Sequence, residues 1–169
     1  MTGARLQLRP GSEAETMRLG ARLAEAAKPE PSRALRVLLH GELGAGKTTL
    51  ARGFLTALGA AGPIRSPSYA LLEHYALADW QAVHVDLYRI EQGAELLSLG
   101  LEDFDRAGTV WLIEWPERAP QQLGAADLSI DLRALQTMHE VSIAAVTPSG
   151  ELWLRKAFAK ELEAETANT

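Results

Sequence analysis

The chain has 169 residues, 47% of them hydrophobic, which is enough material for one domain with its own core. It contains no cysteine, so disulfides, thiol catalysis and cysteine-ligated zinc are excluded. A net charge of −5 with scattered basic residues argues against independent binding to DNA or RNA. No apolar run is long enough to cross a membrane, and residues 1–12 lack the apolar core of a signal peptide, so we expect a cytoplasmic protein with no membrane partner.

Helical and extended patterns alternate along the chain. The segments with apolar residues at helical spacing are 12–27, 47–58, 94–101 and 150–165. The short apolar or alternating segments typical of strands are 35–40, 68–77, 82–88, 109–115, 126–135 and 139–146. Turn residues between the last two strands predict a hairpin, and Ser12 with Glu15 predicts a capping box at the first helix. This order predicts one α/β domain over residues 1–169 with a mixed, partly antiparallel sheet, its last few residues frayed.

A phosphate-binding motif lies between the first predicted strand and the helix at 47–58. Gly41, Gly46, Lys47 and Thr48 match G-x-x-x-x-G-K-[ST] without a mismatch, in the strand–loop–helix context that the motif requires. Glycines let backbone N–H groups approach phosphate oxygens, and the positive end of the helix faces the same point. Lys47 adds a charge near the β and γ phosphates, and the Thr48 hydroxyl is a ligand for Mg²⁺. The motif therefore predicts nucleotide binding in a P-loop NTPase-like three-layer domain.

Two acidic residues follow apolar strands on the same predicted sheet. Asp86 comes after "AVHV" and Glu114 comes after "VWLI". Ligands in α/β sheets bind beyond the carboxyl ends of the strands, so we expect both carboxylates near the phosphate loop. One would hold Mg²⁺ and the other would position an attacking water, although the residues alone do not assign the two roles. A helix cap or a solvated surface group is the structural alternative for either acid.

Other polar and aromatic residues are weaker candidates. Ser66 and Ser68 flank Pro67 in a segment that either senses the γ phosphate, as in nucleotide switches, or forms a structural turn. Trp115 directly follows Glu114 and is a candidate to reach the site. His84 lies inside a strand, where a packing role is the main expectation. The remaining histidines show no spacing typical of a metal site.

Four blocks of sequence together resemble one family. "GELGAGKTTLARGFLTALG", "SPSYALLEHY", "VHVDLYRI" and "LIEWPER" occur between Gly41 and Arg118 in the order and at the spacing of the TsaE family, also called YjeE. The resemblance implies a bacterial P-loop ATPase that supports the formation of threonylcarbamoyladenosine next to the anticodon of tRNA. It also implies TsaD-type and TsaB-type partner subunits, with tRNA bound only indirectly through that complex. ATP and Mg²⁺ are the implied cofactors.

The same resemblance assigns roles to residues. Thr48, Asp86 and Glu114 would lie at the metal, Lys47 at the phosphates and Trp115 close to them. Further residues expected to contact the nucleotide are Thr16, Gly41, Glu42, Leu43, Gly44, Ala45, Gly46, Thr49, Ser66 and Ser68. Three departures from the family pattern stand out: Ser68 in place of threonine, His74 in place of a frequent proline, and a late hairpin without its Gly-Arg pair.

The residues leave other functions open. A small-molecule kinase would use the same loop, but no lid insertion with arginines is evident. A GTPase would carry Asn-Lys-x-Asp, whose absence favours ATP. A nucleotide-sensing interaction module would bind nucleotide and partners with negligible turnover.

Overall fold

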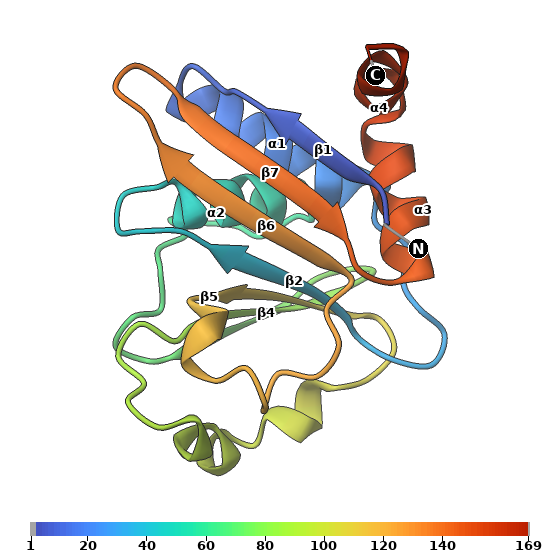
Figure 1. The fold of residues 1–169 in the computed structure, drawn as a ribbon. Coiled ribbons are helices and arrows are strands. Elements are labelled where there is room, and N and C mark those ends of the chain that lie inside the picture. Colours follow the sequence, from blue (N-terminus) through green and yellow to red (C-terminus); the bar gives the residue numbers. More distant parts are fainter. Residues whose placement is uncertain (1–2, 169) are drawn as a thin grey trace.

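A seven-stranded mixed sheet organises the computed structural model, which describes residues 3–168. The strands are β1 (Arg5–Leu8), β2 (Leu35–His40), β3 (Leu72–Ala76), β4 (Gln81–Asp86), β5 (Thr109–Glu114), β6 (Leu128–Ala134) and β7 (His139–Ala145). Their spatial order is β1-β7-β6-β2-β5-β4-β3 (Figure 1). The neighbours β6, β2, β5 and β4 run parallel, whereas β1–β7, β7–β6 and β3–β4 are antiparallel pairs. This arrangement confirms the predicted α/β class and mixed sheet.

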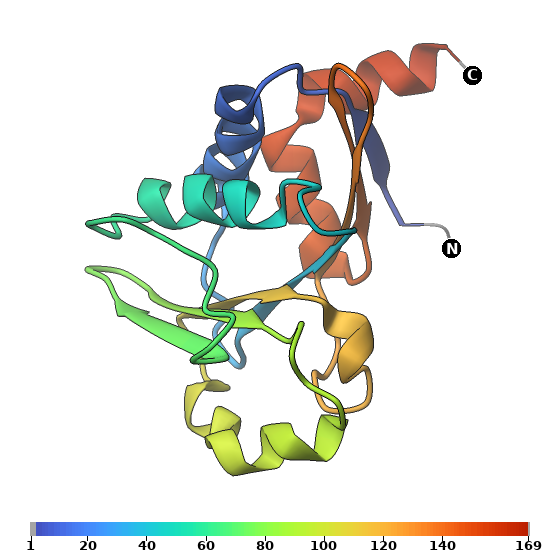
Figure 2. The ribbon, with the colours of Figure 1, turned by 90° about the vertical axis from the view of Figure 1, so that its left-hand side faces the viewer.

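Helices cover one face of the sheet, and short 3₁₀ segments cover part of the other (Figure 2). The helices are α1 (Glu13–Ala26), α2 (Lys47–Ala57), α3 (Pro148–Ala157) and α4 (Ala159–Ala167). The 3₁₀ segments are η1 (Gly93–Leu99), η2 (Leu101–Phe104) and η3 (Pro116–Arg118). Ser12 caps α1 by accepting a hydrogen bond from the Glu15 N–H, while the Glu15 carboxylate accepts one from Gly11 N–H. The predicted cap is therefore present, with Gly11 as its second donor.

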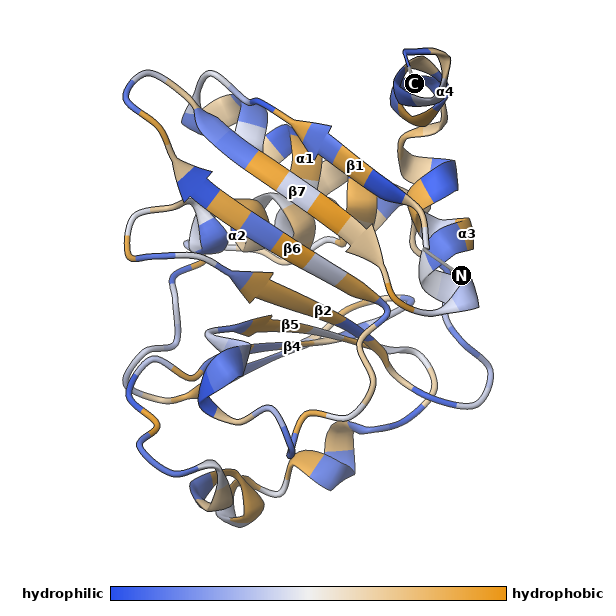
Figure 3. Cartoon of the chain, viewed as in Figure 1, coloured by the Kyte–Doolittle hydropathy of each residue, from blue (hydrophilic) through white to orange (hydrophobic). Residues whose placement is uncertain are grey.

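The two halves of the sheet are buried differently. From Ala82 to Asp86 β4 is buried throughout, and β5 is buried along its whole length, as is typical of parallel strands with both faces covered. In β6 and β7 buried residues alternate with more exposed ones, and the hydropathy colours alternate in the same way (Figure 3). In the described part of the chain, the β4–β5 half of the sheet is covered on both faces, and on one of them the covering segments η1 and η2 are 3₁₀ helices.

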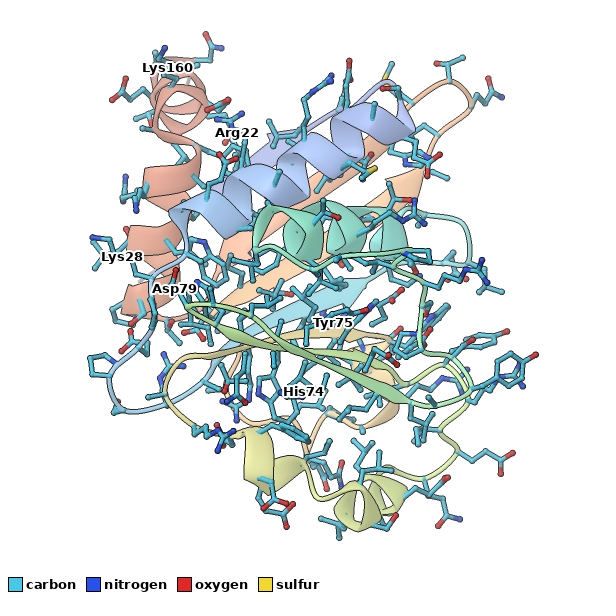
Figure 4. All side chains as sticks on the ribbon, turned by 180° about the vertical axis from the view of Figure 1, so that it is seen from behind. Arg22, Lys28, His74, Tyr75, Asp79 and Lys160 are labelled. Carbon is cyan, nitrogen blue, oxygen red and sulfur yellow. The ribbon has the colours of Figure 1, made fainter. Side chains whose placement is uncertain are left out.

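Helix α1 joins the other helices into one layer. Gly20 of α1 and Gly53 of α2 allow these helices to approach so closely that an added Cβ would meet the backbone of the other helix. On the opposite side of α1, Arg22 donates a hydrogen bond to Glu161 Oε1 of α4 at 2.6 Å, and it lies over the Phe158 ring (Figure 4). These contacts hold α1 against α2 on one side and against α4 on the other.

Several boundaries differ from the sequence-based expectations. The single closing helix over 150–165 was wrong, because the buried Phe158 adopts a non-helical conformation and separates α3 from α4. The predicted helix over 94–101 is 3₁₀, and Gly100 in the left-handed region ends it. Strand β3 starts only at Leu72, after Leu71 with a positive φ of 66°. Strand β1 was not predicted, since its short segment pairs only with the distant β7.

Candidate functional site

A cavity of about 540 Å³ opens beyond the carboxyl ends of β2, β4 and β5. Most of the predicted site residues line it: Leu43, Gly44, Gly46, Lys47, Thr48, Thr49, Ser66, Ser68, Asp86, Glu114 and Trp115. Glu13, Tyr88, Arg89 and His139 line it as well. The cavity therefore brings the phosphate loop, both acids and the segment with the two serines together.

The loop between β2 and α2 has the backbone conformation that its glycines predict. Gly41, Gly44 and Gly46 have φ values of 146°, 77° and 104°, a region that side chains disfavour. A Cβ added at Gly44 would meet no atom within 4 Å, so the loop backbone is open to the cavity there. Gly46 caps α2 without a side chain, which leaves the first N–H groups of the helix without a side-chain acceptor from the cap. This loop suits a phosphate group.

Lys47 lies buried at the centre of the loop, with 5% of its surface exposed. Its Nζ donates hydrogen bonds to the carbonyl oxygens of Gly41 at 2.5 Å and Glu42 at 2.9 Å. It also lies 4.3 Å from the centre of the Trp115 ring. Burial lowers the pKa of the Lys47 ammonium below its ordinary value, although Glu114 and Asp86 act in the opposite direction. An ammonium in this setting interacts strongly with an anion, because little water screens it.

Asp86 and Glu114 form a pair of adjacent carboxylates. They are opposite residues in the parallel register of β4 and β5, and they are 4% and 2% exposed. Thr48 Oγ1 donates to Glu114 Oε1 at 2.8 Å, and Ser66 Oγ donates to Asp86. The Tyr88 N–H donates to Asp86 Oδ1 at 2.9 Å. Two buried carboxylates side by side, next to the Thr48 hydroxyl, favour a cation that would offset their mutual repulsion.

The donor set fits Mg²⁺. Within residues 3–168 no group of three or more His, Asp or Glu side chains could enclose a metal ion. Magnesium, however, usually takes only one or two carboxylates and fills its other positions with phosphate oxygens and water. Asp86, Glu114 and the Thr48 hydroxyl provide such a partial shell beside the phosphate loop.

The structure gives His84 and Thr16 contacts that the sequence did not predict. His84 is fully buried, as the packing expectation implied, but its Nε2 also lies 2.7 Å from Glu114 Oε2. Its position two residues before Asp86 on the same strand was the available signal. Thr16 is fully buried outside the cavity lining, and its hydroxyl donates to the Ser12 carbonyl at 3.3 Å. A contact between Thr16 and a nucleotide stays a prediction.

Comparison with known proteins gives consistent matches. Residues 11–141 match the family model described as "Threonylcarbamoyl adenosine biosynthesis protein TsaE". The tRNA threonylcarbamoyladenosine biosynthesis protein TsaE of Haemophilus influenzae is 36% identical over 140 residues, covering 82% of this chain and 89% of that protein. The Streptomyces coelicolor protein of the same name is 40% identical over 122 residues, 69% and 82% of the two chains. The crystal structure of Bacillus subtilis YdiB superposes with a TM-score of 0.73 at 26% identity, over 98% and 99% of the two chains. No helix in the described part of the chain is long and apolar enough to span a membrane.

Proposed function

Since the chain belongs to the TsaE family, which takes part in the biosynthesis of threonylcarbamoyladenosine in tRNA, we propose that it is a Mg²⁺-dependent ATPase of that pathway. One observation carries the proposal: the phosphate loop, Thr48, Asp86 and Glu114 converge on one cavity. The loop and Lys47 supply donors and charge for phosphate groups, while the acids supply the groups that hydrolysis needs. The absence of Asn-Lys-x-Asp favours ATP over GTP.

Binding would use the loop backbone and Lys47. The N–H groups at the start of α2 would donate to the phosphate oxygens, with the positive end of the helix dipole behind them. Lys47 would exchange its bonds to the Gly41 and Glu42 carbonyls for bonds to the β and γ phosphates. Trp115 covers the ammonium from one side and limits its exposure to water.

Thr48, Asp86 and Glu114 would hold the metal ion. When bound, Mg²⁺ would offset the negative charge of the β and γ phosphates and of the leaving diphosphate. Ser66 would help to orient Asp86, to which it donates a hydrogen bond. Because Ser66 and Ser68 come from the loop before β3, this loop would change its contacts when the γ phosphate leaves.

Hydrolysis would use Glu114 to orient water. The carboxylate would accept a hydrogen bond from a water aligned with the γ phosphorus, and that water would form the new P–O bond as the bond to the bridging oxygen breaks. Lys47 would stabilise the charge that develops on the phosphate oxygens. The products are ADP and inorganic phosphate.

The proposed partners are TsaD-type and TsaB-type subunits, with tRNA reached only through their complex. A net charge of −5 supports this arrangement, because an acidic protein attracts tRNA phosphates poorly. The nucleotide state would then act on the complex through the loop around Ser66 and Ser68.

Mg²⁺-dependent ATP hydrolysis, measured with and without the purified partner complex, tests the proposal. Lys47→Ala provides the blank for contaminating ATPases. We expect a slow basal rate that changes when the partners are added and that chelation of Mg²⁺ abolishes. A rate equal to the Lys47→Ala blank would refute the ATPase assignment. A real rate that the partners leave unchanged would refute their role.

A further inference from the structure

His84 is a buried polar side chain on the face of the sheet that also carries Asp86 and Glu114. It is fully buried, and its strand neighbours Val83 and Val85 are fully buried on the other face. Its Nε2 lies 2.7 Å from Glu114 Oε2. A carboxylate accepts hydrogen bonds, so we assign to the His84 ring the tautomer that carries its proton on Nε2 and donates it to Glu114.

The sheet register places His84 beside Glu114. His84 is opposite Leu112, and Asp86 is opposite Glu114, in the parallel pairing of β4 and β5. Alternate residues of a strand share a face, so His84 and Glu114 are diagonal neighbours on the face that carries the cavity. The imidazole therefore reaches the carboxylate from the sheet side, away from the phosphate loop.

Glu114 is consequently held at both oxygens. Thr48 Oγ1 donates to Oε1 at 2.8 Å from the loop side, and His84 Nε2 donates to Oε2 from the sheet side. Ser66 Oγ adds a longer bond of 3.3 Å to Oε2. His84 belongs to β4 and is fully buried, and Thr48 belongs to α2, so neither position depends on the loop that carries Ser66.

Packing alone does not account for a histidine here. Its Nδ1 is buried without a hydrogen-bond partner in the described part of the chain. An unpartnered ring nitrogen in an apolar layer is unfavourable, and an aliphatic side chain would avoid that cost. The bond to Glu114 is the interaction that offsets it.

We propose that His84 is a positioning residue for hydrolysis: it fixes the orientation of the Glu114 carboxylate, and it does so without touching the nucleotide. This inference rests on the proposed ATPase function. It predicts that nucleotide binding and ATP hydrolysis respond differently to substitution: binding depends on the phosphate loop and Lys47, whereas hydrolysis also depends on the His84–Glu114 hydrogen bond.

Two substitutions at position 84 test this role. His84→Phe keeps a buried planar ring without a donor, and His84→Gln keeps a donor in an amide. Removing a side chain that hydrogen-bonds to a carboxylate of a metal site typically lowers activity by about 10- to 100-fold. We expect His84→Phe to lower kcat by at least about 10-fold and His84→Gln to recover part of that loss. The matched control is His74→Phe on β3, outside the cavity, which should keep the wild-type kcat.

A second readout does not use turnover. The dissociation constant of a fluorescent, non-hydrolysable ATP analogue, measured in EDTA, should change less than about 3-fold in His84→Phe, because the phosphate loop is intact. The unfolding midpoint of each variant, measured without nucleotide, confirms that it is folded. Equal losses of binding and kcat in both His84 variants would show a merely structural role and overturn the proposal.

A double-mutant cycle completes the test. If His84 acts through Glu114, His84→Phe should add no further loss of kcat in a Glu114→Gln background. Losses that multiply would overturn the proposal. A wild-type chain that hydrolyses no ATP would refute the ATPase assignment itself, whereas an active wild type with a fully active His84→Phe variant would refute only this inference.

Discussion

Replacing Gly53 with alanine tests how closely α1 and α2 must pack to position the phosphate loop. Gly53 lies inside α2, the helix that begins at Lys47. A Cβ at this position would lie 2.0 Å from the carbonyl oxygen of Met17 in α1. The reciprocal contact, from Gly20 of α1 to the Leu50 carbonyl oxygen, would be 2.1 Å. The two helices therefore touch through their backbones at both positions.

Two opposing effects determine the stability of Gly53→Ala. Alanine inside a helix is favoured over glycine by about 1 kcal/mol. The added Cβ, however, needs roughly 3.4 Å from its neighbour, so the helices must separate by more than about 1 Å. The neighbour is backbone and cannot rotate away, so we take the overpacking cost at the upper end of its usual range, about 3 kcal/mol. The net loss is about 2 kcal/mol, or a fall in Tm of about 4–8 °C for a chain of this length.

Thermal and urea unfolding of Gly53→Ala against the wild type measure this loss. Thr56→Ala is the matched control, since Thr56 is exposed on the same helix and its replacement reports helix propensity alone. We expect the control to keep or slightly raise the Tm. A Gly53→Ala variant as stable as Thr56→Ala would refute the close contact between α1 and α2.

Three other substitutions give separate expectations. Lys47→Ala should weaken binding of an ATP analogue by about 10- to 100-fold, because a charge-assisted hydrogen bond is lost; unchanged affinity in a fluorescence titration would exclude this loop as the site. Glu114→Gln should lower kcat by about 100-fold with little change in affinity, and equal losses of both would indicate a mainly metal-holding side chain. Burial would raise the pKa of Asp127, but hydrogen bonds from Arg33 and Thr147 outweigh it and hold that pKa below its ordinary value. Asp127 therefore stabilises the fold above its unfolded-state pKa, and that contribution disappears as the pH falls through the lowered value. Asp127→Asn should cost about 2–3 kcal/mol at pH 7, and its Tm difference from the wild type should narrow towards pH 3; a constant difference would contradict the charged interaction.

Local sequence signals predicted most of the residues that the structure brings together around the cavity. The phosphate loop needs only a contiguous motif, a preceding strand and a following helix, and all are encoded within residues 35–58. Asp86 and Glu114 required one more step, the rule that ligands bind beyond the carboxyl ends of parallel strands. The structure adds that these two acids are opposite residues in register.

The features that the sequence did not predict depend on contacts between segments that are far apart in the chain. Strand β1 pairs with β7, which is far along the chain, so nothing adjacent to Arg5–Leu8 predicts it. At the break between α3 and α4, the Phe158 ring is buried and Arg22 of the distant α1 lies over it, contacts that the local sequence does not show. His84 looked like a packing residue because its partner Glu114 lies on another strand.

The same register that aligns the site is fixed by apolar residues on both faces of the sheet. Val83, Val85 and Ile113 pack into the core beside the 3₁₀ segments, while Ala82 and Leu112 pack into the core beneath α1 and α2. A slip of one residue would turn every side chain of a strand to the opposite face. It would move Glu114 away from Thr48 and bring a valine or isoleucine to the cavity. The packing of β4 and β5 into the core on both faces therefore determines the geometry of the acids as well as the stability of the core.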